Sequence, residues 1–310
     1  MAYKAKTPLP VPKSEDAFVK VVPFDTAWMK SRADLAIEGL KGTVRQTSWR
    51  FYITHPSTNT KMWFDLGVSH ASLARADLTM YPPRIQRVQH KVFNTEAAAT
   101  SPAEDIESLG EDPKDVKYII VSHGHWDHIF PAKSYHPNAR LFCGKGSFEY
   151  STPCWPTEAD STFDGRVWDP KISELPIEEF PSPSEAPDKW QPLGPYKNAL
   201  DFFGDGSFWV IDAPGHCLGN IAALARMKNK AGETKWAFLG GDCFHCHHFV
   251  YYPEAPFGKG VSVVPTNTFH ENMEEAREII RQTAELKKGE GNNALIWIAH
   301  CDSLEGIWEF

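Results

Sequence analysis

Three histidines and one aspartate stand within six residues of one another, in the segment Val121-Ser122-His123-Gly124-His125-Trp126-Asp127-His128. Imidazole nitrogens and carboxylate oxygens are the ligands that zinc and its first-row neighbours bind in proteins. A loop that leaves a strand can turn alternate side chains inward, so His123 and His125 can share one ion while Asp127 and His128 face a second. The alternative interpretation is a His-rich loop that is merely solvated.

Three later segments also end an apolar run in a residue that can bind metal. They read Asp212-Ala213-Pro214-Gly215-His216, Leu239-Gly240-Gly241-Asp242 and Trp297-Ile298-Ala299-His300. A single histidine after a strand is usually a surface or core residue. Four such strand ends in one chain, spread over about 180 residues, favour a metal site instead.

The elements that must position these residues are mostly strands. Two apolar runs, Trp49–Thr54 and Lys61–Leu66, are separated by a turn-forming segment and predict a β-hairpin. Further strands are expected directly before the candidate ligands and between them; they cover Val116–Ser122, Phe208–Asp212, Ile221–Arg226, Lys235–Leu239 and Ala294–Ala299. This order of strands and helices predicts a layered α/β sandwich.

Three helices are predicted. Ser101-Pro102-Ala103-Glu104 is a capping box with proline at the first helical position, and it begins a short helix that ends near Gly110. Apolar residues at helical spacing predict a second helix from His270 to Lys287. A third is expected from Thr26 to Leu40.

We expect one domain over residues 1–310, with an N-terminal extension at 1–40 and an irregular insertion at 151–206. The insertion is rich in Pro, Asp, Glu and Trp and shows little periodicity. Long loops of this kind usually form lids or binding walls, and this one is expected to cover one end of the fold.

Composition excludes several classes of protein. The chain has 310 residues, of which 42% are hydrophobic and 23% charged, and its net charge is −8. No run approaches the ~18 apolar residues of a membrane span, and the first residues lack the apolar core of a secretory signal. An acidic chain without a Lys/Arg block is not expected to bind nucleic acid or a membrane surface. We therefore expect a small-molecule substrate as the partner; the oligomeric state cannot be read from the sequence.

The six cysteines are too sparse for a disulfide scaffold and predict reduced thiols in the cytoplasm. Cys243 and Cys246 are spaced as C-F-H-C, but a zinc ribbon would need a second such pair.

On these motifs, which cover roughly residues 40–300, the chain resembles the metallo-β-lactamase superfamily. The resemblance implies an αββα sandwich with a metal site along one edge. Met62-Trp63-Phe64-Asp65-Leu66-Gly67 is similar to the early D-x-G turn of that family. Asp65 would there accept a hydrogen bond from a ligand histidine and orient it; an ordinary turn aspartate is the alternative.

The resemblance implies a site for two divalent metal ions. One ion would be bound by His123, His125 and His216 and the other by Asp127, His128 and His300, with Asp242 bridging both. Zinc is the expected metal, and manganese, iron or cobalt would suit the same ligands. Coordination positions left open indicate catalysis, since a hydroxide shared by two ions is nucleophilic at neutral pH.

Among the branches of the family, the chain is most similar to lactonases and esterases, including the N-acyl homoserine lactonases. Antibiotic-hydrolysing members have Cys or Ser where this chain has Asp242. Flavodiiron proteins need a carboxylate at the position that His125 occupies here. Glyoxalase II-like enzymes add basic residues near the C-terminus, and no obvious match follows His300. Lactonases often carry a tyrosine three residues after the bridging aspartate, and here that residue is His245. An imidazole there can donate a hydrogen bond to an oxyanion, or it can be merely a solvated or supporting residue.

The predicted function is hydrolysis of a lactone or carboxylic ester, with a hydroxide shared by the metals attacking the carbonyl carbon. Asp127, Asp242 and His245 are the predicted catalytic residues; Asp242 would hold the bridge and pass a proton to the leaving group. Trp126, Phe244 and Tyr251 are the predicted substrate contacts. A thioesterase acting on an acyl carrier or a coenzyme A conjugate is the alternative enzyme, and a structural metal module is the alternative without catalysis.

Overall fold

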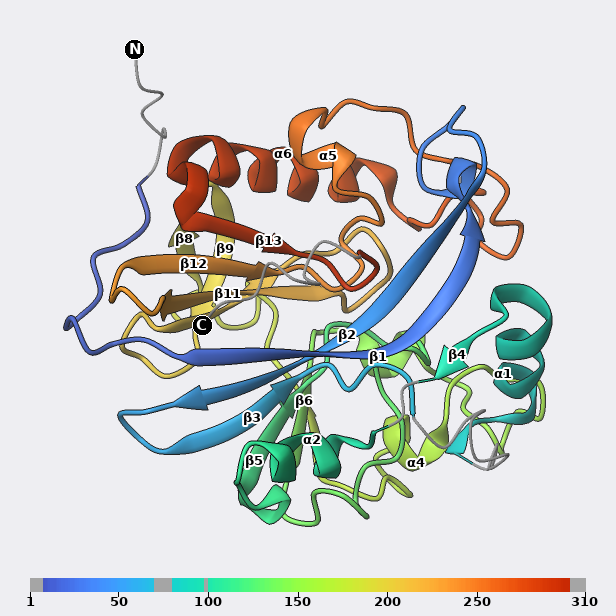
Figure 1. Ribbon diagram of the computed structural model, residues 1–310. Coiled ribbons are helices and arrows are strands. Elements are labelled where there is room, and N and C mark those ends of the chain that lie inside the picture. The colour runs from blue at the N-terminus through green and yellow to red at the C-terminus, as the bar shows by residue number, and fades with distance from the viewer. Residues whose placement is uncertain (1–7, 70–79, 98–99, 302–310) are drawn as a thin grey trace.

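The computed structural model describes residues 8–69, 80–97 and 100–301, and within them two β-sheets face each other. The seven-stranded sheet has the order β4-β1-β2-β3-β5-β6-β7 and the six-stranded sheet the order β13-β12-β11-β10-β9-β8. Helices cover the outer faces, with α5 and α6 against the six-stranded sheet and α2 and α4 against the other (Figure 1). This is the predicted αββα sandwich of the metallo-β-lactamase fold, which confirms the fold class.

The first sheet is built from β1 (Lys20–Arg32), β2 (Thr43–His55), β3 (Thr60–Phe64), β4 (Glu96–Ala97), β5 (Val116–Ile120), β6 (Arg140–Cys143) and β7 (Ile177–Glu179). The second is built from β8 (Gln191–Leu193), β9 (Tyr196–Asp201), β10 (Phe208–Asp212), β11 (Ile221–Lys228), β12 (Thr234–Leu239) and β13 (Ala294–Trp297). The helices are α1 (Pro83–Val88), α2 (Pro102–Ser108), α3 (Ser147–Tyr150), α4 (Gly165–Trp168), α5 (His248–Tyr251) and α6 (Met273–Glu290). Short 3-10 helices cover Ala33–Leu35, Pro113–Asp115 and Gly291–Asn293, and a short π-helix covers Gln89–Phe93. Among the described helices, none has the length and apolar character required to span a bilayer.

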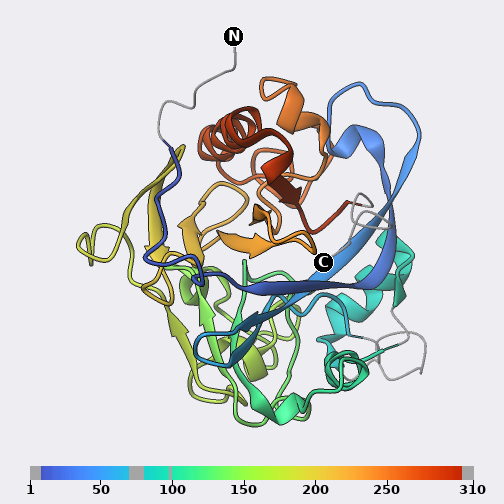
Figure 2. The same ribbon diagram turned by 60° about the vertical axis from the view of Figure 1, so that its left-hand side comes forward.

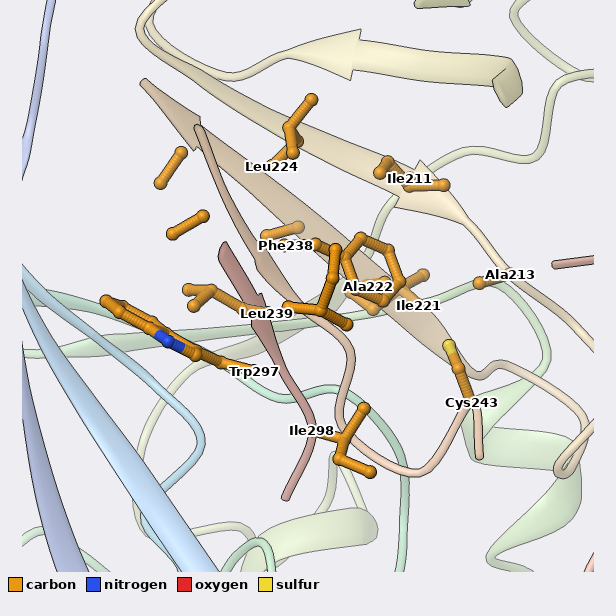
Figure 3. Close-up of a cluster of buried hydrophobic side chains, with 14 of the residues drawn as sticks. Ile211, Ala213, Ile221, Ala222, Leu224, Phe238, Leu239, Cys243, Trp297 and Ile298 are labelled. Atoms are coloured by element: carbon orange, nitrogen blue, oxygen red, sulfur yellow. The ribbon is translucent and has the colours of Figure 1, made fainter. Parts of the chain in front are cut away.

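The alternation of side chains along the strands separates two hydrophobic cores. Phe51 and Phe64 point between the sheets, whereas their neighbours Tyr52 and Trp63 pack on the outer face against the helices. Side chains two residues apart share a face of a strand. Both faces of β2 and β3 are apolar because one is covered by the second sheet and the other by helices. Side chains of the six-stranded sheet, such as Leu224, Phe238 and Trp297, belong to the same core (Figure 3). This core extends to Ile279 and Ile280 of α6.

The hairpin, the capping box and the strands before the candidate ligands lie where they were predicted. β2 and β3 pair antiparallel, from Phe51 opposite Phe64 to His55 opposite Thr60. Ser101 Oγ accepts a hydrogen bond from the Glu104 backbone N–H at 3.2 Å, and the Glu104 carboxylate accepts one from the Ser101 N–H at 2.7 Å. The last long helix begins about three residues later than predicted, because the Asn272 side chain caps it. It also ends about three residues later, at Glu290, where Gly291 takes the positive φ of +57°.

The helix predicted from Thr26 to Leu40 is wrong. Residues 20–32 form β1, which pairs antiparallel with β2 along its whole length (Figure 2), and only Ala33–Leu35 make a short 3-10 turn. Thirteen consecutive residues of β2 offer an edge for pairing, and this tertiary contact outweighs local helix propensity. The described part of the predicted extension therefore contains a strand of the first sheet; residues 1–7 lie outside the described residues.

The predicted insertion at 151–206 holds more regular structure than its composition suggests. It contains α4, and β7 joins the edge of the first sheet while β8 and β9 form the edge of the second.

Candidate metal centre

Five strands of the two sheets end at the same place in the molecule, and a predicted functional residue follows each of them. β3 and β5 are parallel neighbours, as are β12 and β13, and β10 runs in the same direction as β12 because both are antiparallel to β11. Their C-terminal ends therefore lie at common edges. The residues that follow are Asp65 after β3, His123–His128 after β5, His216 after β10, Asp242 after β12 and His300 after β13.

Two glycines permit the tight turns that deliver His216 and Asp242. Gly215 has φ +141°, and a Cβ there would lie 2.4 Å from the backbone nitrogen of Ala276. Gly241 has φ +48°, and a Cβ there would lie 2.7 Å from the side chain of Ser122. Any other residue at either position would meet both an unfavourable backbone conformation and a steric clash.

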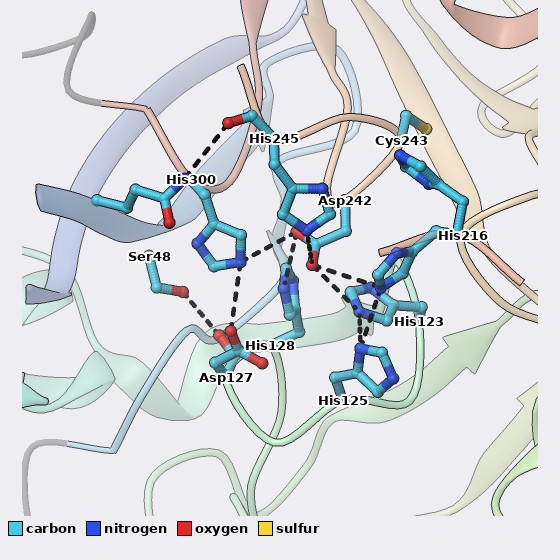
Figure 4. Close-up of polar contacts among 12 residues, drawn as sticks. Ser48, His123, His125, Asp127, His128, His216, Asp242, Cys243, His245 and His300 are labelled. Atoms are coloured by element: carbon cyan, nitrogen blue, oxygen red, sulfur yellow. Dashed lines mark hydrogen bonds and ion pairs between the residues drawn. The ribbon is translucent and has the colours of Figure 1, made fainter. Parts of the chain in front are cut away.

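The structure brings the seven predicted ligands together in two groups that share Asp242 (Figure 4). In the first group, His125 Nδ1 lies 2.9 Å from His123 Nε2 and 3.0 Å from His216 Nε2. Two nitrogens on one tetrahedral zinc would be about 3.3 Å apart. Asp242 Oδ2 completes this group, at 3.7 Å from His123 and 3.5 Å from His216.

The second group consists of Asp127, His128 and His300, together with the other oxygen of Asp242. His300 Nε2 lies 3.3 Å from Asp127 Oδ2 and 3.2 Å from Asp242 Oδ1, and His128 Nε2 also lies 3.2 Å from Asp242 Oδ1. The four side chains are buried.

The outward nitrogens of His128 and His300 are held by neighbouring groups. Asp65 accepts hydrogen bonds from the Ser122 backbone N–H at 2.6 Å and hydroxyl at 2.8 Å, and it lies 2.8 Å from His128 Nδ1. His300 Nδ1 lies 2.8 Å from the carbonyl oxygen of Thr47. Such contacts fix the tautomer and orientation of a metal-binding histidine. Asp65 therefore occupies the orienting position that its D-x-G turn predicts.

Burial shifts the pKa values in the first group toward neutral imidazoles. It lowers the pKa of His123 and His216 well below the ordinary value and lowers that of His125 as well. Because the Ser122 hydroxyl donates to Asp65, it accepts the Nδ1 proton of His123, and the lone pair of His123 Nε2 faces its neighbours. Nitrogen lone pairs this close repel one another unless a cation lies between them.

Charge dominates in the second group. Burial opposes a charged His128, but Asp242 and Asp65 outweigh burial and raise its pKa to about 10. Burial would raise the pKa of Asp242, yet His300 and His128 hold it well below the ordinary value. Two carboxylates in a buried site require positive charge, which a divalent ion would supply. His128 Nε2 and Asp242 Oδ1 are buried and, although close, make no hydrogen bond. The donor set therefore fits two divalent cations.

His245 also lies at Asp242, with its Nε2 3.2 Å from Oδ2. Its ring stacks on Phe269 at a centroid distance of 4.3 Å. Phe269 and the buried His270 belong to the irregular segment 252–272, which sequence reasoning did not connect with the site, since no spacing or motif marks it. Tyr150 was missed for the same reason; its hydroxyl lies 3.0 Å from His125 Nε2.

The three predicted substrate contacts lie in different surroundings. Trp126 is half-buried and packs edge-on against Tyr81 at 5.9 Å. Phe244 is only 1% exposed and belongs to the larger hydrophobic core, a position that favours packing over substrate contact. Tyr251 is 67% exposed on α5.

Comparison with known proteins agrees with the fold and the motifs. Residues 93–216 match the model of the metallo-beta-lactamase superfamily. The metallo-hydrolase mfmC of Annulohypoxylon moriforme is 33% identical over 215 residues, which are 68% of this chain and 51% of that protein. The gamma-lactamase FDB1 of Fusarium pseudograminearum (strain CS3096) is 30% identical over 270 residues, which are 83% of this chain and 61% of that protein. The chain thus spans between half and two thirds of the length of these two relatives.

A solved structure shares the fold. A single-site mutant of AiiA from B. thuringiensis, with N-decanoyl-L-homoserine bound at its active site, superposes with a TM-score of 0.61 at 13% sequence identity, covering 94% of this chain and 96% of that one.

Proposed function

Because this chain contains a metallo-β-lactamase superfamily domain, we propose that it is a metal-dependent hydrolase that opens a lactone or cleaves another carboxylic ester. The observation that supports this most is the sharing of Asp242 by two groups of ligand-type side chains, His123/His125/His216 and Asp127/His128/His300. A structural metal site would need only one closed set of four ligands.

Two divalent ions held there, zinc in the first instance, would polarise the substrate carbonyl and provide a nucleophilic hydroxide at neutral pH. The protein's own contribution is positional. Asp242 reaches both groups, one with each oxygen, and it is the residue we assign to carry a proton toward the leaving group. Asp127, which His300 contacts, holds the second group.

His245 is the residue we assign to the substrate carbonyl oxygen. Its Nε2 lies 3.2 Å from Asp242 Oδ2 and therefore at the shared carboxylate between the groups. A hydrogen-bond donor in this buried place would stabilise the charge that develops on the carbonyl oxygen. The stacking of Phe269 on its ring would keep the donor oriented.

A cyclic amide is the second candidate substrate. The observation in its favour is the similarity to the gamma-lactamase FDB1 over 83% of this chain. Hydrolysis of a lactone and of a γ-lactam both begin with attack on the carbonyl of a ring, so the same site would serve either reaction. The leaving group differs, because an amine needs a proton more than an alkoxide does.

The test is a substrate panel on the purified protein with N-acyl homoserine lactones, aryl esters, thioesters, γ-lactams, β-lactams and phosphodiesters. Each assay is run as purified, after chelation, and after zinc, manganese, iron or cobalt is added back. We expect turnover of lactones or aryl esters that chelation abolishes and metal restores. Turnover confined to phosphodiesters, or undiminished in metal-free protein, would overturn the proposal. The single-domain organisation and the cytoplasmic location stay predictions.

A further inference from the structure

His125 differs from the other histidines of its group in the nitrogen that it directs inward. His123 and His216 face the centre with Nε2, whereas His125 does so with Nδ1. Its Nε2 therefore points outward, and the group that it meets there is the hydroxyl of Tyr150, at 3.0 Å. For Nδ1 to bind a metal, Nε2 must carry the proton and donate it to an acceptor.

We propose that Tyr150 is a positioning residue for His125, and that it couples this imidazole to the carboxylate of Glu271. In this arrangement the Tyr150 oxygen accepts the His125 Nε2–H, and the Tyr150 hydroxyl proton is directed to Glu271. The proposal rests on the metal centre of the proposed function and is independent of its substrate.

The surroundings of Tyr150 suit this role. A tyrosine keeps its proton at neutral pH because its ordinary pKa is about 10, so the Tyr150 hydroxyl can act both as a donor and as an acceptor. Burial raises the pKa of the Glu271 carboxyl, and hydrogen bonding with the Tyr150 hydroxyl opposes this effect. A hydrogen bond that ends on a carboxylate is stronger than one between neutral groups, and it would make the phenol oxygen a better acceptor for His125.

Glu271 also contacts a second member of the group through its backbone. Its N–H donates to the carbonyl oxygen of His216 at 3.0 Å, and the next N–H, that of Asn272, donates to Gly215 at 2.9 Å. One residue thus touches His216 through the main chain and reaches His125 through Tyr150. Because His125 and His216 come from different sheets, this contact fixes the relative position of two ligands that no local structure relates.

The Tyr150 ring is anchored independently of its hydroxyl. It ends α3 and packs edge-on against Phe163 at 5.2 Å. A phenylalanine at this position would keep the packing and lose only the hydroxyl. The variant Tyr150→Phe is therefore the sharpest test. Tyr252→Phe, which removes a hydroxyl from an exposed tyrosine outside the predicted site, is the matched control.

The experiment measures metal binding by competition with a chromophoric chelator, first with zinc, and then records the visible spectrum of the cobalt-loaded protein. For Tyr150→Phe we expect one of the two metal equivalents to bind about 10- to 100-fold more weakly, with an altered cobalt spectrum, while the other equivalent is unchanged. Glu271→Gln should weaken the same equivalent by a smaller factor, because it keeps an acceptor but removes the charge. Tyr252→Phe should match the unmodified protein.

Unchanged affinity for both equivalents in Tyr150→Phe would overturn the proposal. So would a loss of hydrolysis with unchanged metal affinity and cobalt spectrum, since Tyr150 would then act on the substrate. If Tyr150→Phe fails to fold, the same titration of Glu271→Gln decides. A negative result in the substrate panel would leave these measurements intact, because they report on the metal alone.

Discussion

Asp242 is the residue on which the candidate centre depends most. Five imidazoles lie within 3.7 Å of its carboxylate, those of His123, His128, His216, His245 and His300. These histidines follow different strands, and the Asp242 carboxylate is the group that all of them approach. This one residue therefore determines whether the two groups of ligands form one site.

Replacing Asp242 should therefore disrupt both metal positions together. We expect Asp242→Ala to lose both equivalents of metal and Asp242→Asn to bind both more weakly, with hydrolysis reduced by more than about 100-fold, the upper range for groups that only support a ligand. Elemental analysis of the purified variants and the substrate panel measure the two effects. Retention of two tightly bound ions in Asp242→Ala would contradict a shared carboxylate.

His136 offers a prediction that is separate from the metal centre. Its Nε2 accepts a hydrogen bond from the Trp63 indole at 3.0 Å, and its Nδ1 lies 3.0 Å from the carbonyl oxygen of Pro113. Both contacts suit a neutral ring, and burial lowers its pKa to about 4. The unfolded chain, with an ordinary value near 6.5, binds a proton first as the pH falls.

The free energy of unfolding should therefore decrease as the pH falls from about 6.5 to about 4, and the contribution of His136 to this decrease is about 3 kcal/mol. Urea unfolding of the metal-free protein at several pH values measures it. In His136→Asn this part of the pH dependence should be absent, whatever the overall stability of the variant. Equal pH dependence in the two proteins would show that His136 titrates alike in the folded and unfolded states.

At the scale of elements, the segment 252–272 between α5 and α6 forms a wall beside the candidate centre. Two main-chain hydrogen bonds hold this segment. The Gly258 N–H donates to the carbonyl oxygen of Ala36 at 3.0 Å, and the Glu271 N–H donates to that of His216 at 3.0 Å. Between these contacts the segment presents Phe269 to His245. A segment that is held at two points can keep an aromatic ring in one orientation, whereas an unanchored loop could not.

The expected consequence concerns Phe269. Phe269→Ala removes the stacking partner of His245, and we expect kcat/KM for the best ester or lactone to fall between about 2-fold and about 12-fold, the range of one aromatic pair. Phe269→Tyr keeps the ring and should retain the activity of the unmodified protein. Steady-state kinetics of the three proteins measure the effect; equal values for all of them would mean that the stack does not orient His245.

At the scale of the whole molecule, the candidate centre joins the two sheets. His123, His125, Asp127 and His128 follow a strand of the first sheet, whereas His216, Asp242 and His300 follow strands of the second. Ions bound to both sets would link the two sheets at the edge where these strands end. Metal that binds only the folded chain must stabilise it.

Removing metal should therefore lower the thermal unfolding midpoint. A ligand present at about 1,000 times its Kd contributes about 4 kcal/mol to folding stability, and adding metal back should restore the midpoint. Scanning calorimetry with and without chelator measures the change. The midpoint of Asp242→Ala should not respond to the chelator; a midpoint that is equally insensitive in the unmodified protein would contradict the linkage.

The sequence by itself determined the hairpin, the capped helix, the strands that precede the candidate ligands, and the residues that follow those strands. These features depend on local pattern: the two-residue alternation of strands, the capping residues, and glycines at the turns that precede His216 and Asp242. The grouping of distant ligands was expected from the resemblance to a known fold, in which the ends of strands that run in the same direction lie at one edge.

Tertiary structure alone decided what surrounds those ligands. β1 is a strand because β2 offers an edge to pair with, although a helix was expected there. Tyr150 and Phe269 reach His125 and His245 from segments that no spacing in the sequence connects with them. Ligands follow from local patterns, but their supports are side chains brought together by packing, and packing is a property of the whole chain.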